Sequence, residues 1–296
     1  MNQTNTLVVF NPLPQRTRGQ RLQRLCQALD AAQRSYTLLA TDADLKTTAA
    51  SIQQQLAGAD NLIVVGGDGT LHQVVNALAL LKKPPVLSLV PAGTGNDFAR
   101  GWLIPKQPID AVIHCAVYGD PEPLDVGCVN DRYFINSVGV GFDGDLTKRL
   151  AGSKSWWPQL TYLLCALRQL FRYRGVPIQY RDAPTDIEPI QNQSTLLLVV
   201  ANSPYFGAGM HIAPHAQHDS GELAWVHINE CNLVTKLWSF ASIYTGKHIR
   251  NKIVTQGQLN KLHIETVGVP MQADGEYIGC TPAHITSIPQ RLTMRR

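Results

Sequence analysis

The stretch Leu62-Ile63-Val64-Val65-Gly66-Gly67-Asp68-Gly69-Thr70 joins an apolar run to a glycine-rich turn, and a helical pattern follows it. Because glycine has no Cβ, such a turn can adopt positive φ and let main-chain N–H groups approach an anion closely. A carboxylate beside a polyphosphate is repulsive unless a cation lies between them, so Asp68 indicates Mg²⁺ and phosphoryl transfer. An ordinary strand-to-helix turn with a capping Asp explains this pentapeptide alone about equally well.

A second turn of the same kind favours the phosphate site. Residues 86–90 form another apolar run, and Pro91-Ala92-Gly93-Thr94-Gly95-Asn96-Asp97 follows it. If the two apolar runs are neighbouring strands of a parallel sheet, both turns open at its carboxyl edge, where open α/β sheets bind ligands.

The order of apolar patterns predicts two different folds in the two parts of the chain. Up to about residue 125, expected strands at 6–10, 36–41, 62–65 and 86–90 alternate with helical patterns, one of them at 71–81. This alternation predicts a doubly wound α/β domain. Beyond it, short strands at 133–138, 196–201, 223–228 and 261–266 predict a mainly antiparallel second domain.

Bulk composition excludes some classes of protein. The 296 residues are 44% hydrophobic with a net charge of +4, well short of a nucleic-acid-binding signature. No segment approaches the length of a membrane span, and no signal sequence is recognisable. Because the six cysteines show no C-x-x-C spacing, we expect reduced thiols and a cytoplasmic protein.

An ordered set of short motifs runs along nearly the whole chain. It consists of Asn11-Pro12, residues 66–70, 91–97, 124–127 and 136–144, Asn202-Ser203 with 207–209, and Asp274-Gly275-Glu276. In this order the chain resembles the diacylglycerol kinase catalytic domain family, most closely the bacterial YegS-type soluble lipid kinases. These are relatives of sphingosine kinases and, more remotely, of NAD kinases and phosphofructokinases.

The resemblance implies a fold and a division into domains. An α/β nucleotide-binding domain over residues 1–125, completed by 285–296, is expected to precede a β-sandwich lipid-substrate domain over 126–284. The active site is expected in the cleft between them.

The resemblance also implies roles for individual residues. ATP is expected to contact Asn11, Thr41, Gly66, Gly67, Asp68, Gly69, Thr70, Leu71, His72 and Thr94. Three carboxylates, Asp68, Asp97 and Asp125, are expected to hold Mg²⁺, partly through water. Asp274 is expected to be the general base, with Glu276 contacting nucleotide or metal or sharing that role, since an attacking hydroxyl must lose its proton.

Two positions depart from the family pattern. His72 replaces an Asn that is frequent there, which would alter a phosphate contact. Some relatives carry a structural metal bound by a loop with Asp before Gly, whereas this chain has Asp219-Ser220-Gly221-Glu222. A metal at that loop would use Gln217, Asp219 or Ser220, and Glu222.

Segment 154–174 interrupts the second domain with an amphipathic helical pattern. Trp156, Trp157 and the arginines at 168, 172 and 174 would suit docking on an anionic membrane surface. A leucine stripe of this kind is more often packed against the protein core, and we favour that interpretation.

These observations predict an ATP- and Mg²⁺-dependent kinase that phosphorylates the hydroxyl of a diacylglycerol-like lipid. The enzyme would contact the membrane peripherally and transiently to reach its lipid, and a homodimer is compatible with the sequence. An NAD kinase or another small-alcohol kinase is the alternative enzyme, although the Ser/Thr-Ala-Tyr stretch expected for NAD is missing. A regulatory protein that binds nucleotide without turnover is the alternative of another class.

Overall fold

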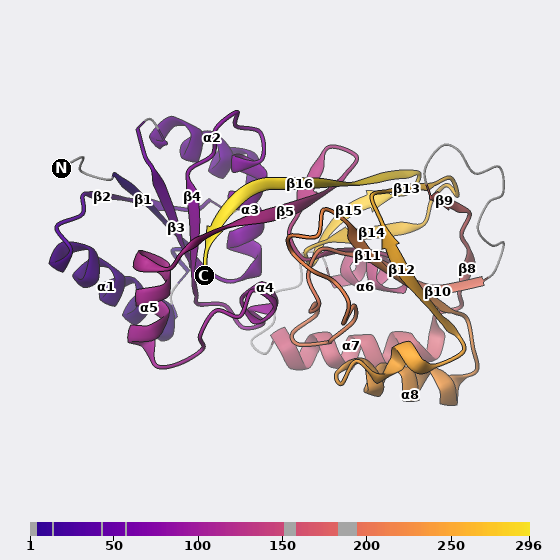
Figure 1. The fold of residues 1–296 in the computed structure, drawn as a ribbon. Helices are drawn as coiled ribbons and strands as arrows, with labels where there is room; N and C mark the ends of the chain where they lie inside the picture. The colour runs from indigo at the N-terminus through magenta and orange to yellow at the C-terminus, as the bar shows by residue number, and fades with distance from the viewer. Residues whose placement is uncertain (1–4, 14, 43, 57, 151–157, 183–193) are drawn as a thin grey trace. The chain divides into compact units, whose positions relative to one another are not determined.

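The computed structural model describes residues 5–13, 15–42, 44–56, 58–150, 158–182 and 194–296. The chain divides into two compact units, residues 1–126 with 290–296 and residues 127–289 (Figure 1). Two strands, β5 (Pro121–Val129) and β16 (Ala283–Arg295), begin in one unit and end in the other.

The first unit contains a parallel sheet with the strand order β2-β1-β3-β4. Its strands are β1 (Thr6–Phe10), β2 (Tyr36–Ala40), β3 (Asn61–Gly66) and β4 (Val86–Pro91). Every residue of β3 is buried, as expected for a parallel strand with helices on both faces. Met294 near the end of β16 pairs in parallel with Leu87 of β4 and so adds a further strand.

Helices cover both faces of this sheet. Their bounds are α1 (Arg16–Ala31), α2 (Leu45–Gln55), α3 (Asp68–Leu78), α4 (Asp97–Gly101) and α5 (Ile109–Tyr118). Leu25 and Leu29 of α1 and Val112 of α5 share one core with Val8 and Ile63 of the sheet. Helices α2 and α3 lie on the opposite face (Figure 1). The predicted doubly wound α/β fold is thus confirmed, but α3 begins at the turn itself and ends three residues earlier than the predicted 71–81.

The second unit is built on an antiparallel sheet with the strand order β12-β11-β10-β7-β14-β15, with β8 paired to β10. The bounds are β7 (Ser137–Gly141), β8 (Val176–Pro177), β10 (Ser194–Ala201), β11 (Leu223–Asn229), β12 (Val254–Leu259), β14 (Pro270–Ala273) and β15 (Glu276–Cys280). The strand predicted at 133–138 is wrong in one respect. The chain forms β6 (Arg132–Phe134) and then β7, because Ile135 and Asn136 turn between them.

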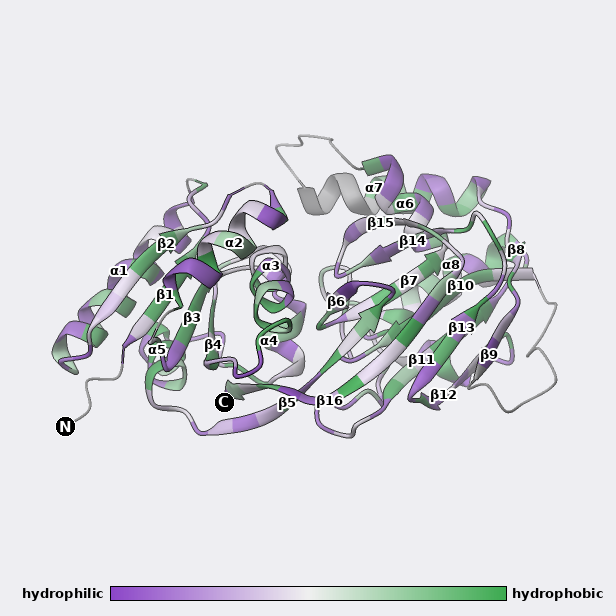
Figure 2. Cartoon of the chain, turned by 90° about the horizontal axis from the view of Figure 1, so that it is seen from above, coloured by the Kyte–Doolittle hydropathy of each residue, from purple (hydrophilic) through white to green (hydrophobic). Residues whose placement is uncertain are grey.

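Alternate residues of β10 enter two different cores, which defines a sandwich. Leu197 and Val199 face one core with helices, and Leu198 and Val200 face another. The second core lies against strands β13 (Lys261–Ile264) and β9 (Tyr180–Asp182) and the start of β16, which pair antiparallel. In Figure 2, β10 carries mainly the hydrophobic colour, as a strand buried on both faces should.

Three helices and a 3₁₀ turn cover the outer face of this sandwich: α6 (Phe142–Leu150), α7 (Pro158–Arg172), α8 (Leu233–Ile243) and η1 (Lys247–Arg250). Ala166 and Leu170 of α7 are buried in the core, whereas Leu164 and Phe171 are more than half exposed. The described part of this helix therefore packs on the protein through one face, while Trp156 and Trp157 lie outside the described residues. Among the described residues, no helix is both long enough and apolar enough to span a bilayer.

Candidate functional site

The carboxyl ends of the four parallel strands meet at one edge of the first unit. In register, Phe10 pairs with Ala40 and with Val65, and Gly66 pairs with Pro91. The predicted site residues Asn11, Thr41, Gly67 and Thr94 follow directly after these strand ends or within three residues of them. The structure thus confirms that both glycine-rich turns open at the same edge of a parallel sheet.

The two turns touch each other through their glycines. A Cβ on Gly67 would lie 2.7 Å from the Cα of Gly93, and a Cβ on Gly93 would lie 2.4 Å from the Cα of Gly67. The expectation of positive φ at these glycines is wrong, because Asn96, at φ 52°, is the residue of the two turns that adopts it. Gly67 and Gly93 are required because two main chains approach within van der Waals contact.

Gly69 differs from its neighbours. It lies in the first turn of α3, is exposed, and has no atom within 4 Å of the position its Cβ would occupy. Alanine would stabilise a helix at such a position, so no contact among the described residues explains the glycine. A ligand that approaches the main chain here would explain it, because anions bind at helix N-termini through free N–H groups.

Asp68 links the two turns by hydrogen bonds. Its carboxylate accepts from the main-chain nitrogens of Asp97 (3.2 Å) and Phe98 (3.1 Å), the first two residues of α4. These N–H groups have no partner within their own helix, so Asp68 caps α4 from another element. Asn96 closes the second turn on itself, exchanging side-chain bonds of 2.9 Å with the main chain of Gly93.

The other two predicted metal ligands are buried carboxylates of the same unit. Asp97 is 5% exposed and lies 3.5 Å from the guanidinium of Arg100. Asp125 is fully buried and accepts from the main-chain nitrogen of Gln290 at 2.7 Å. Within the described ranges, no three Asp, Glu, His or Cys side chains are close enough together to bind one metal ion directly.

The remaining predicted ATP contacts fall into two groups. Asn11 lies at the edge, where its side-chain oxygen accepts from Arg18 at 3.2 Å. Thr70, Leu71 and His72 are buried in α3, and the ring of His72 faces Asn76. These three residues therefore support the turn from within.

Sequence reasoning did not assign a role to Arg18 or Asn96. Asn96 carries a usable signal, because asparagine is enriched among non-glycine residues with positive φ. Arg18 carries none, because its distance from the turns along the chain does not reveal its hydrogen bond to Asn11.

In the second unit, Asp274 lies in the turn between β14 and β15 with φ 49°. Its carboxylate accepts from the main-chain nitrogens of Ile135 (3.0 Å), Asn136 (2.8 Å) and Ser137 (3.1 Å). These three N–H bonds fix the orientation of the carboxylate. Glu276, two residues on, is exposed.

The loop that holds Asp274 is itself anchored from β10. The carbonyl of Asn136 accepts from the main-chain nitrogens of Asn202 (2.8 Å) and Ser203 (3.1 Å), and the side chain of Asn202 donates to Ile135. Asn136, Asn202 and Ser203 are all at most 3% exposed. The motifs 136–144 and Asn202-Ser203, distant in sequence, therefore build one buried polar support for Asp274.

The loop with Gln217, Asp219, Ser220 and Glu222 also belongs to the second unit. The Ser220 hydroxyl donates to the carbonyl of Glu222 (3.1 Å) and accepts from the main-chain nitrogen of Glu222 (3.2 Å). These two bonds close a local turn around Gly221. No metal-binding group of three side chains occurs here or elsewhere among the residues the structure describes.

Comparison with known proteins matches the two parts of the chain to two family models. Residues 5–129 match the family model of the diacylglycerol kinase catalytic domain, and residues 136–296 match that of the YegS C-terminal NAD kinase beta sandwich-like domain. The chain belongs to the YegS-type lipid kinases of the diacylglycerol kinase family.

Several curated relatives of this lipid kinase are named diacylglycerol kinase. That of Bacillus subtilis is 29% identical over 286 residues, covering 95% of this chain and 92% of the relative. That of Mycobacterium tuberculosis (strain H37Rv) is 30% identical over 81% of this chain and 77% of the relative. A crystal structure of a diacylglycerol kinase from Bacillus anthracis has the same fold, with a TM-score of 0.73 at 20% identity, over 100% of this chain and 97% of that one.

Proposed function

We propose that this lipid kinase transfers the γ-phosphoryl group of ATP to the hydroxyl of a diacylglycerol-like lipid, with Mg²⁺ as cofactor. The observation that carries the proposal is the start of α3 at Gly67 and Gly69, which touches the second turn at Gly93 and where Gly69 leaves space that no other described residue fills. The first main-chain N–H groups of a helix have no partner within it and can bind an anion there. Curated relatives named diacylglycerol kinase support the choice of acceptor.

The donor chemistry of the same edge fits Mg²⁺. This ion prefers carboxylate oxygens and retains several of its waters, so it needs no direct contact with three side chains. Asp68, Asp97 and Asp125 would hold it. Asp97 and Asp125 are buried, and hydrogen bonds fix the carboxylates of Asp68 and Asp125. When bound, the ion would offset the negative charge of the phosphates.

Asp274 is the proposed acceptor of the proton that the lipid hydroxyl loses. The three main-chain hydrogen bonds hold its carboxylate in one orientation, which is what a base that must meet a hydroxyl requires. Glu276 is the second candidate, because it is exposed and belongs to the same turn.

The test is a transfer assay with labelled ATP against a panel of lipids in mixed micelles. The panel contains diacylglycerol, monoacylglycerol, phosphatidylglycerol and a sphingoid base, with NAD as the competing acceptor. We expect label in diacylglycerol and complete loss of transfer on addition of EDTA. Transfer to NAD with none to any lipid would reject the proposal, and ATP binding without any transfer would favour a regulatory protein.

The proposed acceptor is insoluble, so the enzyme must meet it at a membrane surface. The exposed Leu164 and Phe171 of α7, together with the arginines of the same helix, support peripheral and transient contact there.

A further inference from the structure

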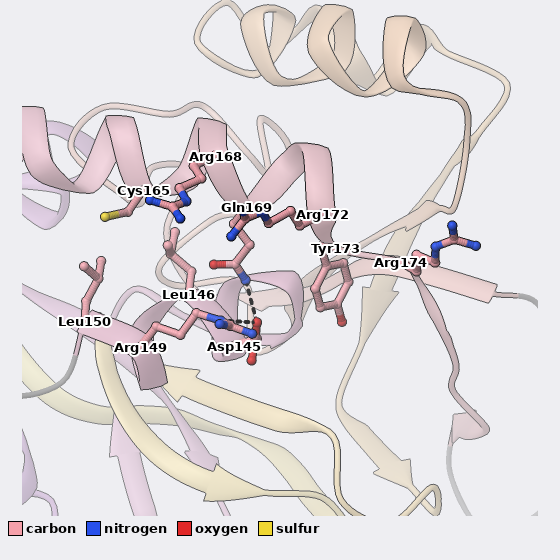
Figure 3. A pocket seen from close by; sticks show the side chains of 10 residues that line it. All are labelled: Asp145, Leu146, Arg149, Leu150, Cys165, Arg168, Gln169, Arg172, Tyr173 and Arg174. Atoms are coloured by element: carbon pink, nitrogen blue, oxygen red, sulfur yellow. Dashed lines mark hydrogen bonds and ion pairs between the residues drawn. The ribbon is translucent and has the colours of Figure 1, made fainter.

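A pocket of about 490 Å³ lies between α6 and α7 in the second unit (Figure 3). None of its lining residues has a role in the proposed chemistry. Helix α6 contributes Asp145, Leu146, Arg149 and Leu150 to the lining, α7 contributes Cys165, Arg168, Gln169 and Arg172, and Tyr173 and Arg174 follow it.

Four guanidinium groups and one carboxylate line this pocket. The carboxylate is already paired within it. Asp145 accepts from Arg149 of the same helix at 2.8 Å and from the side-chain amide of Gln169 at 2.8 Å, and the second bond joins α6 to α7 (Figure 3). The negative charge of Asp145 therefore offsets Arg149 and leaves the other three arginines uncompensated.

Arg168, Arg172 and Arg174 are exposed and have no ion pair with any carboxylate in the described parts of the chain. Arg168 and Arg172 lie four residues apart on one helix, an arrangement of like charges that destabilises a helix. The negative end of the helix dipole favours Arg172 in the last turn, but it does not account for Arg168. An anion bound between these side chains would relieve the repulsion.

Gln169 adds a second, independent observation. Its side chain is 7% exposed, and its amide nitrogen donates both to Asp145 and to the carbonyl of Phe142. The two donated bonds fix which way the amide points, and its buried oxygen has no hydrogen-bond partner among the described residues. Buried acceptors are normally satisfied, so a donor from a ligand or a water belongs at this position.

Tyr173 contributes a hydroxyl that stays protonated. Burial raises its pKa, and the nearby carboxylates of Asp145 and Glu230 raise it further. The apolar side chains of Leu146, Leu150 and Cys165 complete the wall. The pocket thus combines positive charge, a neutral hydroxyl, an unsatisfied acceptor and apolar surface.

We propose that this pocket binds a phosphate ester that also carries hydroxyl groups, of the glycerophosphate type. Arginine suits phosphate because its planar fork donates two parallel hydrogen bonds. A free ligand hydroxyl would donate to the side-chain oxygen of Gln169. The same chemistry occurs in a phospholipid headgroup and in a free glycerol phosphate, and the experiment separates the two. This site is separate from the proposed chemistry, since its residues belong to neither the nucleotide edge nor the Asp274 turn, although Arg168 and Arg172 are the α7 arginines that also support membrane contact.

The experiment measures direct binding to the full chain without nucleotide. The probes are glycerol 3-phosphate, by calorimetry, and sedimentation with phosphatidylcholine vesicles that contain or lack phosphatidylglycerol. The pocket variant carries Arg168→Gln and Arg172→Gln. The matched control carries Arg132→Gln and Arg250→Gln, two exposed arginines of the same unit outside the pocket, so both proteins lose the same charge.

We expect the pocket variant to bind the phosphate probe about tenfold more weakly or worse, since it loses two charge-assisted contacts, while the control stays within about twofold of the parent. Loss of binding to both probes assigns the site to any glycerophosphate. Loss confined to phosphatidylglycerol vesicles assigns it to a headgroup at a membrane. Equal weakening in pocket variant and control, or a parent protein that binds neither probe, would overturn the proposal.

A second pair of variants guards against unfolding. Arg168→Lys and Arg172→Lys retain the charge but lose the bidentate fork, and the melting temperature is recorded for each protein. We expect the double lysine variant to remain folded and to show an intermediate affinity for glycerol 3-phosphate. An affinity equal to that of the parent would mean that the protein attracts glycerol 3-phosphate through positive charge alone, without arginine-specific hydrogen bonds. That result would contradict the proposed binding site.

Discussion

Gly67 and Gly93 lie back to back at the end of strands β3 and β4, so close that a Cβ on Gly67 would meet the Cα of Gly93 at 2.7 Å. Neither residue needs glycine for its own φ. The two main chains are held at this separation by the strand register that pairs Gly66 with Pro91 and by the hydrogen bond from Ala92 to the carbonyl of Gly66. The contact therefore joins the two turns into one structure.

Gly67→Ala should destabilise the protein and abolish nucleotide binding together. The added methyl group forces the two turns apart, a kind of overpacking that typically costs about 1–3 kcal/mol. Chemical denaturation and ATP titration of the same preparation measure both effects. A stable Gly67→Ala protein with normal ATP affinity would show that the two turns need not touch.

Gly69→Ala is the matched comparison, because its methyl group meets no atom of the other described residues within 4 Å. Alanine in the first turn of α3 should leave stability unchanged or raise it by up to about 1 kcal/mol. We expect ATP affinity nevertheless to fall, since the methyl group occupies the space assigned to phosphate. Unchanged ATP affinity would remove Gly69 from the proposed site.

Substitutions of Asp68 should separate its structural role from its charge. Asp68→Ala removes the acceptors for the N–H groups of Asp97 and Phe98, so unfolding free energy should fall by about 0.5–2 kcal/mol, as for loss of a helix cap. Asp68→Asn keeps one acceptor and should cost less stability. Both variants should lose Mg²⁺-dependent transfer, and full activity in Asp68→Asn would mean that the carboxylate acts only as a cap.

Substitutions in the turn after β14 should locate the general base. Asp274→Asn should leave ATP affinity nearly intact while lowering kcat by roughly 10²-fold or more, the usual scale for loss of such a group. Circular dichroism checks the fold, since the carboxylate also holds Ile135, Asn136 and Ser137. Near-normal turnover in Asp274→Asn with loss in Glu276→Gln would transfer the role to Glu276.

His227 should make stability depend on pH below neutrality. Burial lowers its pKa from 6.5 to about 4, and its ring nitrogens lie 3.3 Å from the Tyr180 hydroxyl and 2.9 Å from that of Thr195. As pH falls from about 6.5 to about 4, the unfolded chain binds a proton that the folded chain does not, so stability decreases, by about 3 kcal/mol in all. Denaturation across this range should show a flatter profile for His227→Asn. The profile would not become level, because burial lowers the pKa of His248 in the same direction.

The local sequence pattern is sufficient to predict a strand's bounds where each residue's environment follows from its neighbours in the chain. Strand β1 was predicted to the residue, and β3 and β4 to within one residue at each end, because an apolar run that ends at a glycine or proline leaves little choice. The break between β6 and β7 was missed, since Ile135 and Asn136 continue the strand-like pattern. They leave the ladder because their main-chain nitrogens bind Asp274, some 140 positions later.

By itself the sequence determined the α/β and sandwich order, the carboxyl edge at which Asn11, Thr41 and the two turns lie, and the family. Each of these depends on periodicity or on short motifs, which are local in the chain. Only the tertiary structure decided that Gly67 and Gly93 must be glycine because two main chains touch, and not because of φ, and that Asp68 caps α4. It also decided that the pocket beside α6 and α7 contains three arginines with no ion pair among the described residues. These features arise when segments far apart in the chain approach within a few ångströms, and that distance is set by packing of whole elements, which no local pattern records.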